Sequence, residues 1–165
     1  MSRKRKTRGS PYVDHPRYGD RPIDSGYNYS EDEVRNSYWG YRREDIFIET
    51  AIPADLEKQN FPTFPRKLYV DIRRKCIQCE RWFIFFAKEQ KYWYEELGFI
   101  IDADCVKCVE CRKKEQGIKQ LISEYEKLLK NTSRTESETI NLKKIAQELY
   151  EFGYIKNKQK VDSIA

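Results

Sequence analysis

The chain has 165 residues, which suits one ordinary domain or a small domain with appendages. Hydrophobic residues make up 39% of it and charged residues 36%, which excludes an apolar core that runs through the whole chain. No run approaches the ~18–20 apolar residues of a membrane span, so we expect no membrane partner.

The formal net charge of +5 is concentrated at the N-terminus. Five cations and no acid lie in the first ten residues, so the remaining residues sum to zero. The cations are Arg3, Lys4, Arg5, Lys6 and Arg8. Such a segment is either a solvated terminus or a contact for nucleic acid or an acidic surface. We predict a disordered basic arm over residues 1–14, with these five residues as its nucleic-acid contacts.

The cellular compartment is predicted from the N-terminus and from the cysteines. The basic N-terminus is not followed by the apolar segment of a secretory signal. The cysteine count is odd, at five, which favours a reducing compartment over a disulfide framework. We therefore expect a cytoplasmic protein.

Residues 15–69 are predicted to form an irregular extension that packs on the following core. Aliphatic residues are scarce up to residue 45, and Pro and Gly are spaced so as to forbid long regular elements. Residues 46–48 suit a short strand or an apolar anchor. Residues 53–59 suit one or two helical turns, because proline favours the first position of a helix.

An aromatic and basic cluster lies within this extension, at Tyr38, Trp39, Tyr41, Arg42 and Arg43. Aromatic rings beside arginines can stack on nucleic-acid bases. The alternative, which we favour, is that Trp39 anchors the extension on the core and covers a strand near residues 82–86.

Residues 70–115 contain the predicted core. The alternation over residues 67–74 predicts a strand, and residues 82–86 predict a second strand that is apolar on both faces. Residues 88–98 predict a short helix that ends at Gly98.

Residues 116–165 are predicted to form a pair of helices. A long helix is expected to begin at Cys111, and its apolar stripe is Ile118, Leu121, Ile122, Tyr125, Leu128 and Leu129. A capping signal at Thr135 and Glu138 precedes a helix over residues 139–152. The two helices can pair as a hairpin or offer their stripes to a partner protein.

All five cysteines lie in two clusters that predict a zinc site. They are spaced as Cys76-x-x-Cys79 and Cys105-x-x-Cys108-x-x-Cys111. Two such pairs provide the four soft ligands of a closed structural zinc site. We predict one structural Zn²⁺ held by Cys76, Cys79, Cys108 and Cys111. Cys105 remains an alternative ligand, because its spacing to Cys108 is the same.

Other interpretations of the cysteines are weaker. A redox pair would need an accessible Cys-x-x-Cys near a βαβ unit, and no such pattern surrounds either cluster. Core packing alone does not produce the doubled spacing. The single histidine, His15, is far upstream, so we expect it at the surface or in a cap. Basic residues flank both clusters at 73–75 and 112–114, and they suit either compensation of the thiolates or phosphate contact.

The sequence resembles a family, the zinc-ribbon or treble-clef domains of small, mostly uncharacterised bacterial proteins. The resemblance rests on a knuckle, an aromatic strand, a Glu-Gln that opens an aromatic helix, Gly-Phe, and a second knuckle followed by Arg. These elements are Cys76, Cys79, Phe83, Phe85, Glu89, Gln90, Tyr94, Gly98, Phe99, Cys108, Cys111 and Arg112. The segments HPRYGDRP and TAIPADLEKQNF extend the resemblance to about residues 15–115. It implies zinc binding and carries no established activity.

The fold class expected is therefore a small α+β domain stapled by zinc, zinc-ribbon or treble-clef-like, with an irregular N-terminal extension and a C-terminal helical pair. We expect a zinc-binding structural or adaptor module that binds nucleic acid or a ribonucleoprotein. The alternative is a protein-protein adaptor that uses the C-terminal helices. No catalytic motif is present, so we expect neither an enzyme nor a small-molecule substrate.

Overall fold

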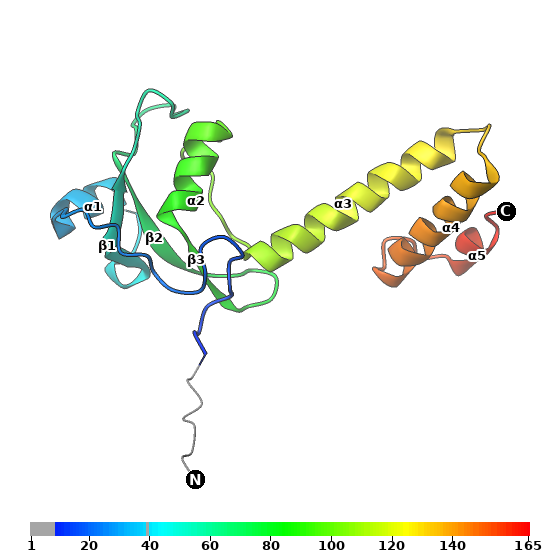
Figure 1. Ribbon diagram of the computed structural model, residues 1–165, viewed down its shortest axis with the longest axis horizontal. Coiled ribbons are helices and arrows are strands. Elements are labelled where there is room, and N and C mark those ends of the chain that lie inside the picture. Colours follow the sequence, from blue (N-terminus) through cyan, green and yellow to red (C-terminus); the bar gives the residue numbers. More distant parts are fainter. Residues whose placement is uncertain (1–8, 39) are drawn as a thin grey trace, which may run out of the picture. The chain divides into compact units, whose positions relative to one another are not determined.

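The computed structural model describes residues 9–38 and 40–165, which form two compact units (Figure 1). The first unit extends to Cys111 and the second begins at Arg112. The predicted border between the core and the helices, at residue 115, is four residues further along the chain. Within the described residues, no helix is both long and apolar enough to cross a membrane.

The first unit is built on a three-stranded antiparallel sheet in the order β1-β2-β3. Its strands are β1 (Ile46–Pro53), β2 (Leu68–Lys75) and β3 (Trp82–Phe85). The strands predicted over residues 46–48, 67–74 and 82–86 are thereby confirmed. The central strand, β2, has five consecutive buried residues, because both of its faces are covered.

A bulge interrupts β1 opposite the middle of β2. Phe47 pairs with Asp71 and Ile52 pairs with Tyr69, so β1 uses more residues than β2 over the same length. The Thr50 hydroxyl fills the gap, because it donates to the Phe47 carbonyl at 2.6 Å and accepts from the Asp71 amide at 2.7 Å. The backbone groups released by the bulge are therefore satisfied.

Short helical segments flank the sheet. They are α1 (Glu31–Ser37), the 3₁₀ turn η1 (Arg43–Asp45), α2 (Ala87–Lys91) and the π-helical turn η2 (Tyr92–Glu96). The helix predicted over residues 88–98 is confirmed as α2 and η2, which Gly98 ends with a φ of 68°. The turns predicted over residues 53–59 are found only in part, because Pro53 still belongs to β1 and a single turn follows over residues 56–58. The Asp55 carbonyl accepts from the Lys58 amide at 3.2 Å, and the Asp55 carboxylate accepts from the Glu57 amide.

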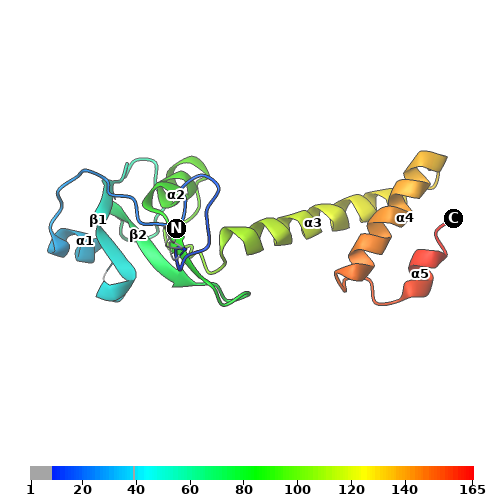
Figure 2. The ribbon, with the colours of Figure 1, turned by 60° about the horizontal axis from the view of Figure 1, so that its bottom comes forward.

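The N-terminal extension lies along the sheet (Figure 2). The Val13 amide donates to the Trp82 carbonyl at 2.8 Å, and the Ile23 amide donates to Asp71 at 2.9 Å. The rings of His15 and Tyr18 pack on Phe86. Residues 12–18 thus cover the strand at residues 82–86, which was predicted to be apolar on both faces. Tyr12 and Val13 already pack here, although the predicted arm included them.

The second unit is a helical hairpin closed by a third, short helix. Its helices are α3 (Val109–Lys130), α4 (Glu136–Glu151) and α5 (Lys158–Asp162), and α3 also supplies the last residues of the first unit. Five residues of the predicted stripe of α3, from Ile118 to Leu128, pack against buried residues of α4 and α5, whereas Leu129 is exposed and its prediction is wrong. Of the two predicted alternatives, a hairpin or stripes offered to a partner protein, the structure thus shows the hairpin. The capping box at Thr135 is confirmed, and α5 was not predicted.

Candidate metal centre

The first cysteine pair lies in the tight connection between β2 and β3. The Cys76 amide donates to the Arg81 carbonyl at 2.9 Å, and the Glu80 amide donates to the Cys76 carbonyl at 2.9 Å. Glu80 has a φ of 60°, which lets the chain reverse directly after Cys79. This reversal places both sulfur atoms on the same side of the connection.

The second pair lies at the start of α3. Cys108 immediately precedes the helix, and Cys111 lies in its first turn. A spacing of three residues places both on one face of a helix. The free amide groups and the dipole of a helix N-terminus also favour thiolates at these positions.

The two pairs converge on one point. The sulfur atoms of the four cysteines all lie within 4.8 Å of one another, and the Sγ atoms of Cys79 and Cys108 are 3.8 Å apart. A tetrahedral zinc with Zn–S bonds of about 2.3 Å requires sulfur–sulfur separations of about 3.8 Å. The four side chains therefore fit a single structural zinc ion.

The first pair is prepared for the thiolate state. Burial raises the pKa of Cys76, but the backbone amides of Cys79, Cys108 and Gln78 donate to its sulfur and lower the pKa to about 6. The pKa of Cys79 is lowered chiefly by the Arg81 backbone amide, with a further contribution from the Arg81 side chain. This pair can therefore receive a cation at neutral pH.

In the second pair, burial outweighs the effect of the helix N-terminus, so both thiols keep their protons until a cation binds. Burial raises the pKa of Cys108, and burial together with the neighbouring thiols raises the pKa of Cys111 to about 12. A zinc ion must displace these protons, so zinc affinity should rise with pH. Once bound, zinc would be held by four thiolates in a closed site with no position for a substrate.

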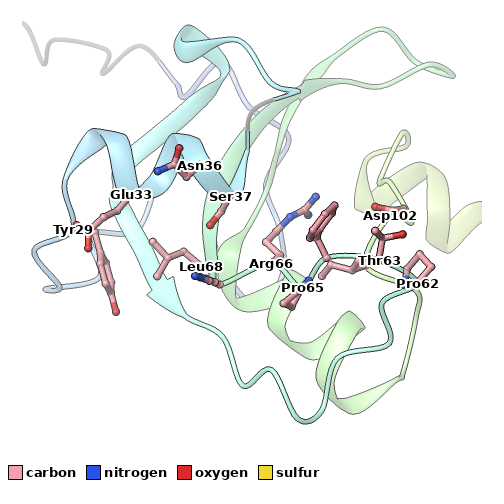
Figure 3. A pocket seen from close by; sticks show the side chains of 13 residues that line it. Tyr29, Glu33, Asn36, Ser37, Pro62, Thr63, Pro65, Arg66, Leu68 and Asp102 are labelled. Carbon is pink, nitrogen blue, oxygen red and sulfur yellow. The ribbon is translucent and has the colours of Figure 1, made fainter.

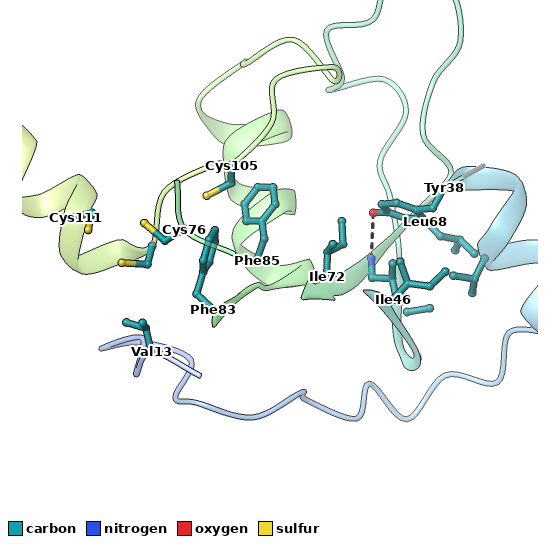
Figure 4. Close-up of a cluster of buried hydrophobic side chains, with 14 residues drawn as sticks. Val13, Tyr38, Ile46, Leu68, Ile72, Cys76, Phe83, Phe85, Cys105 and Cys111 are labelled. Atoms are coloured by element: carbon teal, nitrogen blue, oxygen red, sulfur yellow. Dashed lines mark hydrogen bonds between the residues drawn. The ribbon is translucent and has the colours of Figure 1, made fainter. Parts of the chain in front are cut away.

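Cys105 lies outside the group of four. Its side chain is 1% exposed, and the thiol donates to the Lys107 carbonyl at 3.4 Å. Figure 4 shows it near Phe83 and Phe85 in the buried cluster of the first unit. The structure thus brings together the four predicted ligands and uses the fifth cysteine for packing.

Among the described residues, the possible metal-binding group consists of the four cysteines and does not include His15. Its Nε2 atom lies 3.5 Å from Glu89, and its Nδ1 atom accepts from the Arg17 amide at 3.1 Å. It therefore serves the extension, as a half-buried residue that caps a local turn.

Arg81 is a cation that acts directly on a cysteine of the metal site. Its side chain lowers the pKa of Cys79 and pairs with Glu110. By contrast, Arg73 pairs with Asp45 at 2.9 Å, and Arg74 pairs with Asp104. Arg81 was not among the predicted site residues, and its position two residues after Cys79 is the sequence feature that points to it.

Within the aromatic and basic cluster, Tyr38 is not available to stack on bases. Tyr38 is 1% exposed, its hydroxyl donates to Gln90 at 2.7 Å, and the hydroxyl also accepts from the Val70 amide, drawn as a dashed line in Figure 4. The adjacent arginines, Arg42 and Arg43, are paired with acids. The stacking hypothesis is therefore wrong for Tyr38.

Some predicted residues lie outside the described part of the chain. They are Arg3, Lys4, Arg5, Lys6, Arg8 and Trp39. Nucleic-acid contact by the five cations stays a prediction, as does the anchoring role of Trp39.

Comparison with known families agrees with this geometry. Residues 70–120 match a family described as "Probable treble clef domain". The matched region contains both cysteine pairs, most of β2, all of β3 and the start of α3. Searches of curated proteins and of solved structures found no match.

Proposed function

From a treble clef zinc domain that carries basic segments on both sides, we propose a structural zinc module whose partner is a nucleic acid or a ribonucleoprotein. The closed set of four thiolates supports a structural role for the metal, because a catalytic zinc keeps an open position. Binding then depends on the protein surface and on the charges that flank the zinc domain.

The distribution of charge is the observation that carries the proposal. Residues 9–111 contain 15 Lys and Arg against 19 Asp and Glu, whereas residues 112–165 contain 12 against 8. The neutral body is therefore an acidic zinc unit followed by a basic helical unit. With the five cations of residues 3–8, the two basic segments lie on either side of the zinc unit in the sequence.

The attachment of the N-terminal segment adds to this argument. Tyr12 bridges to Trp82, directly after the first cysteine pair, and Val13 lies in the same buried cluster as Cys76. The five cations therefore join the described chain only a few residues from the zinc site. If the five cations bind the phosphate backbone, the arginines of the sheet can keep their salt bridges with acids.

The test is the salt dependence of binding by the zinc-loaded protein. Fluorescence anisotropy with a labelled single-stranded RNA should show an affinity that falls steeply with salt. Replacing all five N-terminal cations by Gln should reduce the slope of log K against log salt by about 3 to 4, because each phosphate contact contributes about 0.7.

A matched control replaces five cations of the sheet and the extension that already pair with acids: Arg21, Arg42, Arg43, Arg73 and Arg74. This variant must retain zinc, and its slope should change by less than that of the N-terminal variant. No binding at low salt, or equal slopes for wild type and the N-terminal variant, would contradict the proposal.

A protein partner is the second candidate, supported by exposed apolar side chains of the helical unit. Ile140 on α4 is 64% exposed, and Phe152 and Tyr154 after it are 49% and 51% exposed. The predicted stripes, apart from the exposed Leu129, pack within the hairpin. A partner recovered with the protein after nuclease treatment, and lost with Ile140→Asp, would favour this candidate.

A further inference from the structure

A cavity of about 730 Å³ lies in the first unit, away from the cysteines (Figure 3). It is bordered by α1, by the loop of residues 62–67 that precedes β2, and by residues 101–102. Its volume is within the range of small-molecule sites, about 300–1,000 Å³. Its lining combines apolar side chains with a few polar groups, as such sites do.

Arg66 is the residue that the surrounding structure fixes most firmly in this lining. The buried amide of Gln59 binds its backbone twice: it donates to the Arg66 carbonyl at 2.7 Å and accepts from the Arg66 amide at 2.9 Å. The guanidinium carbon lies 4.7 Å from the centre of the Tyr38 ring. Tyr38 is itself held by two buried hydrogen bonds, so the guanidinium rests on a rigid base.

The guanidinium has no carboxylate partner. Arg73 and Arg74 of the same unit form salt bridges, but no carboxylate of residues 9–38 and 40–165 lies within 4.0 Å of the half-buried Arg66 guanidinium. The guanidinium instead lies on the Tyr38 ring and donates to the Tyr41 side chain, and Asp102, the acid that acts on it, lies beyond 4.0 Å, so a bound anion would be its first close negative charge. A guanidinium also presents a planar fork of donors that matches a carboxylate or phosphate group.

The lining contains two cations, Arg66 and Lys67, and two acids, Glu33 and Asp102, so its formal charge is zero before a ligand binds. The two acids would repel a polyanion, which favours a ligand with a single negative charge. Glu33 is committed to the cap of α1, where it accepts from the Ser30 amide at 2.8 Å. An apolar part of the ligand has a counterpart in Phe64, which is 81% exposed and lines the same cavity.

We propose that this cavity binds a small organic monoanion, with a carboxylate or phosphodiester group on Arg66 and an aromatic or apolar part against Phe64. The site is separate from the zinc centre and does not depend on the proposed function. It also departs from the expectation that the chain has no small-molecule partner, although it requires no reaction.

The experiment is an NMR titration of the full-length, zinc-loaded protein. The anionic probes are N-acetylphenylalaninate, for the carboxylate, and the dinucleotide ApA, for the phosphodiester. Their neutral counterparts are N-acetylphenylalaninamide and adenosine. At least one anion should shift the Arg66 side-chain Nε–H signal and the amides of residues 64–68 saturably. Its neutral counterpart should bind about tenfold to a hundredfold more weakly.

Variants separate this site from general attraction of anions. Arg66→Met retains the apolar stem on Tyr38 and should weaken binding of the anion about tenfold or more. Arg17→Met removes an exposed arginine outside the cavity and should leave the affinity unchanged. Arg66→Lys retains the charge without the planar fork and should give an intermediate affinity.

Zinc content and the amide spectrum report whether each variant is folded. If Arg66→Met does not fold, Arg66→Lys and the ratio of anion to neutral affinity decide the question. Absence of saturable shifts with both anions, equal affinity for a neutral counterpart, or an Arg66 variant that binds like wild type would overturn the proposal.

Discussion

Glu80 is the one non-glycine residue of the described chain with a positive φ, at 60°. It lies directly after Cys79, where the first knuckle must reverse before β3. A side chain in this conformation costs roughly 1–2 kcal/mol, whereas glycine adopts it without that penalty. The backbone at Glu80 is therefore strained, and a glycine at this position would relieve the strain.

Replacing Glu80 by Gly should raise the free energy of unfolding of the zinc-loaded protein by up to about 1 kcal/mol, because the gain exceeds the added entropy of the unfolded chain. Urea unfolding followed by circular dichroism measures the change. Gln78→Gly, in the same knuckle but without a positive φ, should lower stability instead. Equal effects of the two substitutions would show that the conformation of Glu80 is not the cause.

Asp71 is a buried carboxylate that joins three parts of the first unit. It accepts from the Ile23 amide at 2.9 Å and from the Ala87 amide at 2.7 Å, and it lies on β2. Burial raises its pKa to about 6, although the two amides oppose the shift. The folded protein therefore binds this proton more tightly than the unfolded chain, in which the pKa is about 3.9.

Stability contributed by protonated Asp71 is fully present below about pH 3.9 and is lost as the pH rises through 6. The free energy of unfolding of the wild type, relative to Asp71→Asn, should thus fall between about pH 4 and pH 6 and level off above that. The difference cancels the pH dependence of zinc binding, which both proteins share. The ¹³C signal of the carboxyl should titrate near pH 6, and a midpoint near 4 would contradict this account.

At the scale of elements, the two knuckles and Cys105 make different contributions. Cys76→Ser or Cys111→Ser removes a thiolate from the group of four and should abolish stable zinc binding. Cys105→Ala should retain one zinc per chain and lose about 1 kcal/mol of stability, because its thiol is buried among apolar side chains. Metal analysis after dialysis gives the stoichiometry. Loss of zinc from Cys105→Ala would overturn the assignment.

Elements with a strong local signal were predictable from the sequence. The alternation before Cys76 predicts β2, the spacing of the cysteines predicts the metal centre, and the capping box at Thr135 predicts the start of α4. In each case the signal is a short local pattern, and for the metal centre it is the same spacing repeated in two separate cysteine pairs. Ser30 and Glu33 form the same kind of capping box before α1, and this signal was available although it was not used.

Features that depend on distant residues could not be predicted. The burial of Tyr38 depends on Gln90, 52 residues away, and the position of Ile23 depends on Asp71, 48 residues away. The bulge in β1 likewise requires Thr50 to meet Asp71 on the next strand. Such contacts follow from the packing of the sheet, and the pattern of one segment does not contain them.

At the scale of the whole molecule, the two units should respond differently to removal of zinc. The first unit has a sheet of only three strands and is held at one end by the metal, whose apparent binding free energy is ~10–16 kcal/mol in small zinc domains. The helical unit has its own buried cluster, which includes Leu142 and Leu149. It contains none of the four ligands.

A strong chelator under reducing conditions should therefore unfold residues 70–111 and spare the hairpin from about Ile118 onwards. Hydrogen exchange of the amides, measured before and after chelation, would locate the change. Adding zinc back should restore protection, and a chelator saturated with zinc is the control. Retained protection of β2 and β3 without metal, or loss of protection throughout α4, would contradict this prediction.

The position of Cys111 inside α3 has a consequence for how that helix forms. A helix begins with an unfavourable nucleus of about three ordered residues, which costs roughly 4 kcal/mol before elongation starts. Ligation of Cys108 and Cys111 orders this first turn, so the metal provides the nucleus. The apolar stripe begins only at Ile118, and Gly117 precedes it. The segment between Cys111 and Gly117 can thus be helical when zinc is bound and coil when zinc is absent. The number of helical residues in α3 therefore reports whether the site holds the metal.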